Sequence, residues 1–284
     1  MALKVEKAAT TGFCFGVKRA VDMLEKYARE NKGAQTLGAV VHNQQVLDNL
    51  AELGVSVAKT PAEITGDTVV TSSHGVTPQL EASLIKCGIK TLSTTCPFVL
   101  RAQAATRRLA KAGFFVVVYG DTSHKEVIGI LGWADGRGIA TTDVKDVAAI
   151  KPKPRRLGLL SQTTQVPSSF VAFTQKVLEH AYVRDSEIRI IDTICHDIRA
   201  RQAAALELAI RVDLMIVIGG HGSANTNRLT ELCTTVTETR LIETANEVDP
   251  AWLKGKQTVG ITSGASTPES IVNEVAKKLQ SLAG

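Results

Sequence analysis

The 284-residue sequence has few aromatic residues and no long apolar segment. Aromatic side chains make up 4% of the chain, and Lys and Arg residues are scattered with little aromatic interleaving, which argues against a nucleic-acid-binding protein. The longest apolar runs, FFVVVY and LMIVI, are far too short to span a bilayer. The N-terminal sequence, MALKVEKAATTG, lacks the features of a signal peptide. We therefore expect a cytoplasmic protein that binds neither nucleic acid nor membrane.

Several common motifs are also missing. The five cysteines include no Cys-x-x-Cys pair, which argues against a closed zinc site. Their odd number, without a secretion signal, argues against a disulfide framework. No Walker or dinucleotide-binding glycine fingerprint is found, so a nucleotide is not indicated. The net charge of +5 would suit an anionic substrate or an acidic electron donor.

The sequence does contain a threefold internal repeat around Cys14, Cys96 and Cys195. Each cysteine precedes an amphipathic helical pattern, and each helix gives way to an apolar run typical of a strand covered on both faces: TLGAVV, FFVVVY and LMIVI. Strands that alternate with helices favour a parallel α/β architecture. We therefore predict three similar α/β modules, 1–95, 96–194 and 195–284.

Polar residues follow the strands at matching positions. His42, His124 and Ser223 each lie 28 positions after the cysteine of their module, from 14 to 42, from 96 to 124 and from 195 to 223. A second strand pattern in each module also ends in polar residues, in TVVTSSHG, LGLLSQTT and TVGITSGAS. Ligands bind beyond the carboxyl ends of strands in open α/β sheets, so we expect the cysteines and polar tips to converge on one cavity.

Three thiolates from distant parts of the chain suit a 4Fe-4S cluster with one iron left open. Cys14, Cys96 and Cys195 are the candidate ligands, because each follows a strand end, where loops carry function. Cys87, in a helical stretch, and Cys233 fit the commoner interpretation of a cysteine as a small hydrophobic residue.

The polar tips predict an anion pocket. They offer imidazole, hydroxyl and amide donors without opposing carboxylates, which suits a phosphate group: His42, His74, Ser223, Asn225 and Ser266. Glycine-rich segments beside them let backbone N–H groups approach oxygen atoms closely. Glu126 is the one carboxylate near this junction and the natural proton carrier, and Thr163 and Gln162 could hold a substrate hydroxyl or relay a proton.

Nine short motifs, in their order and spacing, resemble the family of 4-hydroxy-3-methylbut-2-enyl diphosphate reductases, the IspH/LytB family. The motifs are GFCFGVKRAV, VVHN, SSHGV, TTCPFV, HKEVIG, QTT, IDTIC followed by RQ, GSANTNRL and TSGASTPE. The resemblance covers essentially the whole chain. It implies a pseudo-threefold trefoil of α/β modules around a central 4Fe-4S cluster held by Cys14, Cys96 and Cys195.

The same resemblance implies the remaining roles. Glu126 would deliver the proton, with Thr163 and His124 in its hydrogen-bond network, while the substrate hydroxyl meets the open iron. The products would be isopentenyl and dimethylallyl diphosphate, in the last step of the non-mevalonate (MEP) isoprenoid pathway, with a ferredoxin or flavodoxin as electron donor. The diphosphate would be bound by His42, His74, Ser223, Asn225 and Ser266, with His124 and Thr163 also in the substrate site.

Two alternatives stay open. A non-redox lyase of the quinolinate synthase type also uses a three-cysteine 4Fe-4S cluster, but a dicarboxylate substrate would call for arginines at the tips. An iron-sulfur sensor would need a recognition element such as a DNA-binding module or basic tail, and the sequence shows neither. The sequence departs from the common pattern of the family at Gln103, Ala224, Lys125 and the segment 196–200, which puts details of the pocket wall in doubt.

Overall fold

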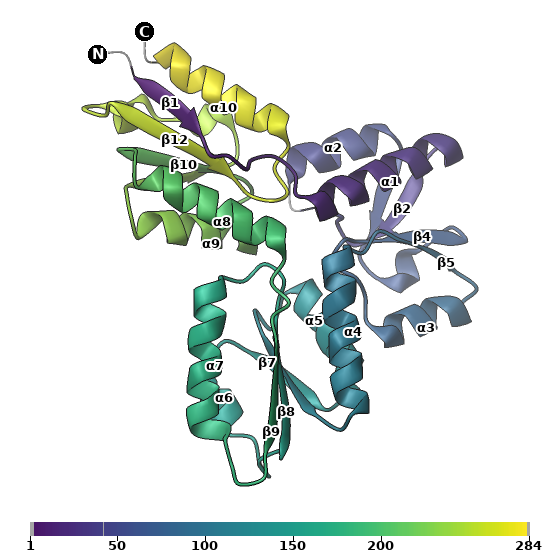
Figure 1. Cartoon of the computed structure of the whole chain (residues 1–284). Helices are drawn as coiled ribbons and strands as arrows, with labels where there is room; N and C mark the ends of the chain where they lie inside the picture. The colour runs from purple at the N-terminus through teal and green to yellow at the C-terminus, as the bar shows by residue number, and fades with distance from the viewer. Residues whose placement is uncertain (1–2, 42, 283–284) are drawn as a thin grey trace. The chain divides into compact units, whose positions relative to one another are not determined.

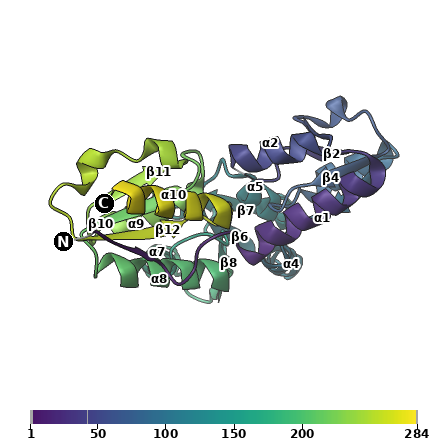
Figure 2. The ribbon, with the colours of Figure 1, turned by 90° about the horizontal axis from the view of Figure 1, so that it is seen from above.

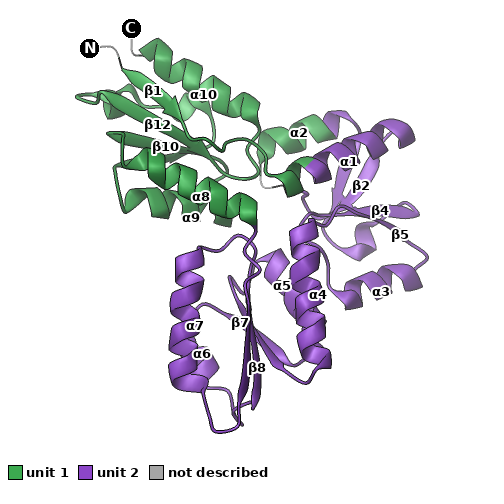
Figure 3. Ribbon diagram, viewed as in Figure 1, with its two compact units in different colours: residues 1–18, 41–50, 196–284 green, residues 19–40, 51–195 purple. Residues whose placement is uncertain are grey.

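The chain divides into two compact units, as a computed structural model describing residues 3–41 and 43–282 shows (Figure 1). Unit 1 consists of residues 1–18, 41–50 and 196–284, and unit 2 of residues 19–40 and 51–195 (Figure 3). The described strands form three four-stranded sheets, and every strand pairing is parallel. This confirms the predicted α/β class and its threefold set of strands.

Unit 1 contains one sheet, in the order β1-β12-β10-β11. Its strands are β1 (Lys4–Lys7), β10 (Leu214–Ile218), β11 (Thr239–Ile242) and β12 (Thr258–Ser263). Its longer helices are α8 (His196–Ala209), α9 (Ala224–Thr234) and α10 (Glu269–Leu282), and its short 3-10 helices are η3 (Ala245–Glu247) and η4 (Pro250–Leu253).

The central strand β10 is covered on both faces (Figure 2). Leu214, Ile216 and Ile218 pack into a core shared with α10. Met215 and Val217 point to the other face, into a core shared with α8 and α9. This alternation explains the continuous LMIVI run, because side chains of successive residues in a strand lie on opposite faces.

Unit 2 contains two sheets, in the orders β3-β2-β4-β5 and β7-β6-β8-β9. The strands are β2 (Ala34–Leu37), β3 (Val55–Ala58), β4 (Thr68–Thr71), β5 (Lys90–Ser93), β6 (Phe115–Tyr119), β7 (Gly138–Thr141), β8 (Arg156–Ser161) and β9 (Glu187–Ile191). Its helices are α3 (Pro78–Lys86), α4 (Pro97–Lys111), α5 (Lys125–Leu131), α6 (Val144–Ala148) and α7 (Pro167–Ala181), with η1 (Pro61–Glu63) and η2 (Gly132–Ala134). Helices α1 (Phe15–Asn31) and α2 (Gln44–Glu52) have residues in both units.

The β6 sheet has one helical layer on each face (Figure 1). Helices α4 and α5 cover one face through a core that includes Leu109, Val116 and Ile130. Helix α7 covers the other, where the rings of Tyr119 and Phe173 lie 4.7 Å apart. None of the helices in the described residues is long and apolar enough to cross a membrane.

The three sheets share one strand order, and in each the strand that leads to a cysteine of the repeat lies at an edge. Strands β1, β5 and β9 each lead to one of the three cysteines and pair with β12, β4 and β8 respectively. The N-terminal strand β1 thus belongs to the sheet formed by the C-terminal strands. The predicted module boundaries at residues 95 and 194 stay a prediction.

One strand prediction needs correction. The run TLGAVV was expected to form a strand, but β2 ends at Leu37. Gly38 has a φ of 76°, in the left-handed region that ends the extended conformation. Val40 and Val41 are buried outside any strand, so their hydrophobicity reflects burial of a loop instead of strand formation.

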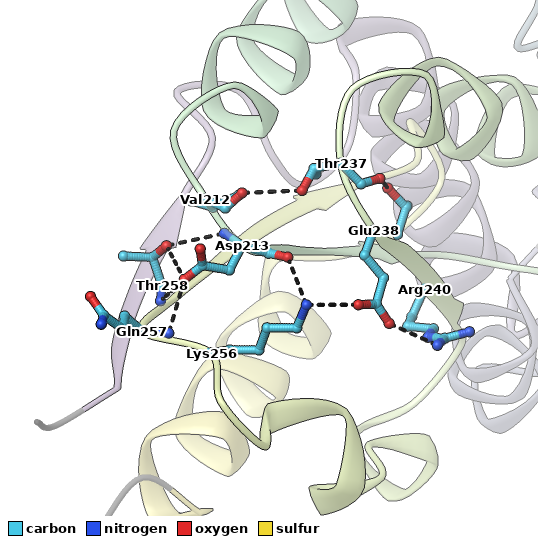
Figure 4. A network of polar contacts seen from close by, with 9 residues as sticks. Val212, Asp213, Thr237, Glu238, Arg240, Lys256, Gln257 and Thr258 are labelled. Carbon is cyan, nitrogen blue, oxygen red and sulfur yellow. Dashed lines mark hydrogen bonds and ion pairs between the residues drawn. The ribbon is translucent and has the colours of Figure 1, made fainter.

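The amino end of the unit 1 sheet is closed by a polar network (Figure 4). The Asp213 carboxylate accepts hydrogen bonds from the N–H groups of Gln257 and Thr258, both at 2.9 Å, and from the Thr258 hydroxyl at 3.0 Å. Lys256 Nζ lies 2.8 Å from a carboxylate oxygen of Glu238. These bonds hold the starts of β10 and β12 together.

Candidate active site

The three predicted cluster ligands have the same backbone anchor. The N–H of Cys14, Cys96 and Cys195 donates in each case to a carbonyl just beyond the neighbouring strand, at 3.0 Å: the carbonyls belong to Ala265, Ser73 and Thr163 respectively. Each cysteine is partly exposed, and none is in a disulfide. The three-fold repetition seen in the sequence is therefore also a repetition of local structure.

The cysteines are divided between the units. Cys14 lies in unit 1, whereas Cys96 and Cys195 lie in unit 2. Among the described residues, no group of three or more His, Cys, Asp and Glu side chains is arranged to hold a metal ion. The convergence of the three thiols on one cluster stays a prediction.

In unit 2 the predicted proton carrier Glu126 is bonded directly to Thr163. Glu126 is 2% exposed, at the start of α5. One of its carboxylate oxygens accepts the Thr163 N–H at 2.6 Å, and the other accepts the Thr163 hydroxyl at 3.0 Å. The Thr163 carbonyl in turn accepts the Cys195 N–H. A buried carboxylate is thereby linked through one threonine to a predicted cluster ligand.

Two histidines of unit 2 extend this chain of contacts toward Cys96. His124 is the N-cap of α5, and its Nδ1 accepts the Glu126 N–H at 3.2 Å. A neutral His124 ring therefore carries its proton on Nε2. The His74 ring stands nearly perpendicular to it, at 84°, with the ring centres 5.2 Å apart. His74 directly follows Ser73, whose carbonyl anchors Cys96.

Unit 2 thus links six predicted site residues through hydrogen bonds, one ring contact and the peptide bond between Ser73 and His74. Together, they offer two thiols, two imidazoles, a hydroxyl and a carboxylate at the carboxyl ends of β4, β5, β6, β8 and β9. In order along the chain of contacts they are Cys96, His74, His124, Glu126, Thr163 and Cys195. The strands of a parallel sheet end on the same side, so His74 and Cys96 lie at the end of one sheet and His124, Thr163 and Cys195 at the end of the other. The ring contact between His74 and His124 joins the two sets.

In unit 1 the predicted anion-binding residues lie at the ends of the neighbouring strands β10 and β12. Ser223 is the N-cap of α9 and is buried, as is Ser266. The loops are tied together because the Gly264 N–H and the Thr267 hydroxyl both donate to the Ile218 carbonyl, at 2.8 and 3.0 Å. Ser266 follows Ala265, the residue that anchors Cys14.

Asn225, in the first turn of α9, has a buried Nδ2 without a hydrogen-bond partner among the described residues. Leaving a buried amide donor unpaired costs about 1–3 kcal/mol, so such a group marks a place where a ligand acceptor would be stabilising. The same loops exclude larger side chains, because a Cβ at Gly264 would overlap the Thr226 hydroxyl.

Sequence reasoning missed one residue beside Cys14. Arg201, in α8, is 1% exposed and donates to the Gly12 carbonyl at 2.8 Å and to the Ser263 carbonyl at 2.7 Å. The Gly12 N–H donates to the Ser263 hydroxyl at 3.0 Å, so the loop before Cys14 is held on both sides. Burial raises the pKa of the Cys14 thiol, and the hydrogen bond from Val17 and the positive charge of Arg201 oppose that rise. In the sequence, Arg201 stands out only as part of the RQ pair that follows IDTIC.

Other predicted residues have mixed outcomes. His42 lies outside the described residues. Cys233 is fully buried, and burial raises its pKa to about 11, in line with its interpretation as a small hydrophobic residue. Cys87 is exposed at the end of α3, so that interpretation is wrong for it. Gln162, beside Thr163, is fully buried and accepts the Asp121 N–H at 3.2 Å.

The sequence matches the family described as LytB protein over residues 5–280. The chain belongs to this family. It is 56% identical over 280 residues to the 4-hydroxy-3-methylbut-2-enyl diphosphate reductase of Dehalococcoides mccartyi (strain CBDB1), covering 99% of both chains. The corresponding protein of Geobacter metallireducens is 41% identical and covers 99% of this chain and 98% of its own. The predicted family is therefore confirmed.

Two solved structures of reductases also match the chain. One, described as (E)-4-hydroxy-3-methyl-but-2-enyl diphosphate reductase, the terminal enzyme of the non-mevalonate pathway, is 37% identical, with a TM-score of 0.71 and coverage of 99% of this chain and 100% of its own. The E-1-hydroxy-2-methyl-but-2-enyl-4-diphosphate reductase from Plasmodium falciparum is 25% identical, with a TM-score of 0.90 and coverage of 98% and 88%. These matches extend over nearly the whole of this LytB chain.

Proposed function

We propose that this LytB protein removes the hydroxyl group of 4-hydroxy-3-methylbut-2-enyl diphosphate reductively, with Glu126 as the proton carrier. The chain is a reductase of that family, an oxidoreductase of the non-mevalonate pathway. The observation that carries the proposed mechanism is the contact between buried Glu126 and Thr163, within a chain of contacts that runs from Cys96 to Cys195. The proposed products are isopentenyl and dimethylallyl diphosphate.

The donor set fits the implied 4Fe-4S cluster. Cys14, Cys96 and Cys195 are soft sulfur ligands outside any disulfide, and the backbone of each is fixed by the same 3.0 Å hydrogen bond. Three thiolates would leave one iron open. When bound, such a cluster would supply electrons and a Lewis acid for the departing hydroxyl.

The unit 1 tips are proposed to bind the diphosphate. The unpaired Nδ2–H of Asn225 would donate to a phosphate oxygen, together with the hydroxyls of Ser223 and Ser266. A ligand acceptor there relieves the cost of the buried unpaired amide, which adds to the binding energy. We assign His42 and His74 to the same anion.

The unit 2 tips are proposed to handle the proton. Glu126 is buried and held by two hydrogen bonds from Thr163, so its position is fixed before substrate arrives. His124 holds the first turn of α5 through the Glu126 N–H and presents its own proton on Nε2. Thr163 couples the carboxyl group to the substrate hydroxyl through its own hydroxyl.

The reaction balances as C–OH plus two electrons and two protons, giving C–H and water. We propose that an acidic one-electron carrier of the ferredoxin or flavodoxin type supplies the electrons. The predicted cytoplasmic location stays a prediction. Family membership speaks against the lyase and sensor alternatives, since the relatives are named as reductases.

An anaerobic assay tests this function. The cluster-loaded protein is mixed with the hydroxymethylbutenyl diphosphate and a reduced viologen dye, and products are analysed for the two five-carbon diphosphates. We expect both products and oxidation of two dye equivalents per product. Turnover without dye oxidation would indicate a lyase, and an absence of turnover in protein with full iron content would contradict the proposed substrate.

A further inference from the structure

The outer face of α4 carries a groove that the proposed active site does not use. Its volume is about 480 Å³, and one wall is Trp133 of η2. The α4 side of the groove is formed by residues at helical spacing, mainly Leu100, Ala104, Arg107, Arg108 and Lys111. All of these residues belong to unit 2.

The outer face of α4 carries positive charge that no acidic residue of the helix balances. Helix α4 has four basic residues, Arg101, Arg107, Arg108 and Lys111, and no acidic one. Among the described residues, none of these four forms an ion pair. Helix α1 is different, because there basic and acidic residues pair along the helix, as in the 3.5 Å contact of Arg29 with Glu25.

The groove also offers flat and apolar surface between the charges. The Arg107 guanidinium lies 5.4 Å from the centre of the Trp133 ring, a cation–π contact that holds both side chains in place. Leu100, which also lines the groove, is 48% exposed. Arginine and tryptophan are enriched in protein-binding surfaces, and the exposed leucine adds apolar area beside them.

We propose that this groove is the docking surface of the acidic one-electron carrier protein that reduces the enzyme. The inference rests on the proposed function, which requires two electrons from outside the chain. Charge complementarity selects the partner, because a cationic face steers an acidic carrier and suits the small, transient interfaces of electron-transfer pairs.

The position of the groove supports this partner. Leu100 donates its N–H to the carbonyl of Cys96 at 3.0 Å, so the groove begins one helical turn from a proposed cluster ligand. From Leu100 to Lys111 the helix extends about 16 Å, at about 1.5 Å per residue. That length exceeds what a single phosphate group can span and fits the edge of a small protein. Each docked carrier would deliver one electron, so two carriers are oxidised for each hydroxyl released as water.

The test reverses two exposed charges. The double variant R108E/K111E is compared with K277E/K278E, which makes the same change in net charge on exposed residues of α10. Turnover is measured anaerobically with a reduced acidic ferredoxin and, separately, with reduced methyl viologen. We expect R108E/K111E to raise the KM for ferredoxin about tenfold at low ionic strength, with less effect at 0.5 M salt, where the Debye length is only a few ångströms. Turnover with viologen should stay within twofold, and the control variant should change neither value.

Binding of oxidised ferredoxin, measured by calorimetry without substrate, gives a second readout that does not depend on turnover. An unchanged ferredoxin KM and affinity in R108E/K111E would overturn the docking site. Equal losses with ferredoxin and viologen would overturn it too, by showing a general defect. If wild-type protein with full iron content makes no product with viologen, the proposed function fails instead, and the calorimetric comparison still decides the docking site. If R108E/K111E lost binding of inorganic diphosphate but kept its affinity for ferredoxin, the groove would be a site for a small anion, and the proposal would be contradicted.

Discussion

The strand ends of unit 1 and those of unit 2 are built on similar sheets but carry different chemistry. In unit 1 they offer small neutral donors, Ser223, Asn225 and Ser266, with one buried amide unpaired among the described residues. In unit 2 they carry a buried carboxylate, Glu126, whose two oxygens are both bonded to Thr163. An unpaired donor is suited to receive an anion, whereas a buried carboxyl group held by two hydrogen bonds is suited to deliver a proton at a fixed place.

A second contrast lies within unit 1, between the two ends of its sheet. At the amino end the Asp213 carboxylate accepts three hydrogen bonds from Gln257 and Thr258 (Figure 4). At the carboxyl end, polar atoms of Asn225 and Thr226 are buried without partners in the described structure. Polar groups at the amino end of these strands are paired with each other and stabilise the fold. Those at the carboxyl end include groups, unpaired among the described residues, that a ligand could bind.

The largest expected effect comes from the three cysteines that both units contribute. Cys14→Ser, Cys96→Ser and Cys195→Ser should each lose the cluster and all turnover, because a hydroxyl is a poor ligand for iron in such clusters. Iron analysis after anaerobic reconstitution should give about four irons per wild-type chain and less than about one in each variant. Cys87→Ser, at an exposed position, should keep full iron content. Full iron in any of the first three variants would remove that cysteine from the ligand set.

Arg201→Met should mainly lower stability. The substitution leaves the buried carbonyls of Gly12 and Ser263 without a donor, so the free energy of unfolding should fall by about 3 kcal/mol. Arg211→Met is the control, because Arg211 is 53% exposed in a surface pair with Glu6 and should cost less than about 0.5 kcal/mol. Urea unfolding of the apo proteins measures both. Equal changes would show that Arg201 does not hold the loop before Cys14.

Asn225→Ala should separate ligand binding from stability. Loss of the unpaired Nδ2 donor should raise the KM about tenfold and leave the stability of the ligand-free protein unchanged or slightly higher. Asn227→Ala is the matched control in the same helix, because Asn227 Nδ2 donates to the His221 carbonyl at 2.9 Å. It should lower stability by about 1 kcal/mol and leave the KM unchanged. The reverse pattern would argue against an anion at Asn225.

Asp213→Asn should give the smallest effect, confined to stability. Hydrogen bonds from Gln257 and Thr258 hold the pKa of Asp213 below its ordinary value of 3.8. A carboxyl group whose pKa is lowered by folding stabilises the protein above about pH 4. This stabilisation is lost as the pH falls through the lowered pKa. The variant should therefore have a lower Tm than wild type at pH 7, and the difference should shrink below about pH 4. A difference in Tm that is independent of pH would contradict this linkage.

Local patterns in the sequence predicted much of this arrangement. LMIVI predicts β10 without error because both faces of that strand are buried. The 28-residue offset leads to His124 and Ser223, which the structure places at the N-caps of α5 and α9. The pairing of β1 with β12 could not be predicted, because it joins residues more than 250 positions apart. Arg201 was missed for a related reason: an arginine in a helix is usually exposed, and only the approach of Gly12 and Ser263 from distant segments buries it.

The division of labour between the two units is tested most directly by Glu126→Gln. The amide keeps the shape of the side chain but cannot deliver the proton. We expect kcat to fall by about 10²-fold to 10⁴-fold, with the KM and the iron content of wild type. Steady-state kinetics with reduced viologen, on protein of matched iron content, gives kcat and KM separately. A kcat within about threefold of wild type, or a loss that lies in the KM instead, would contradict the assignment of proton delivery to unit 2.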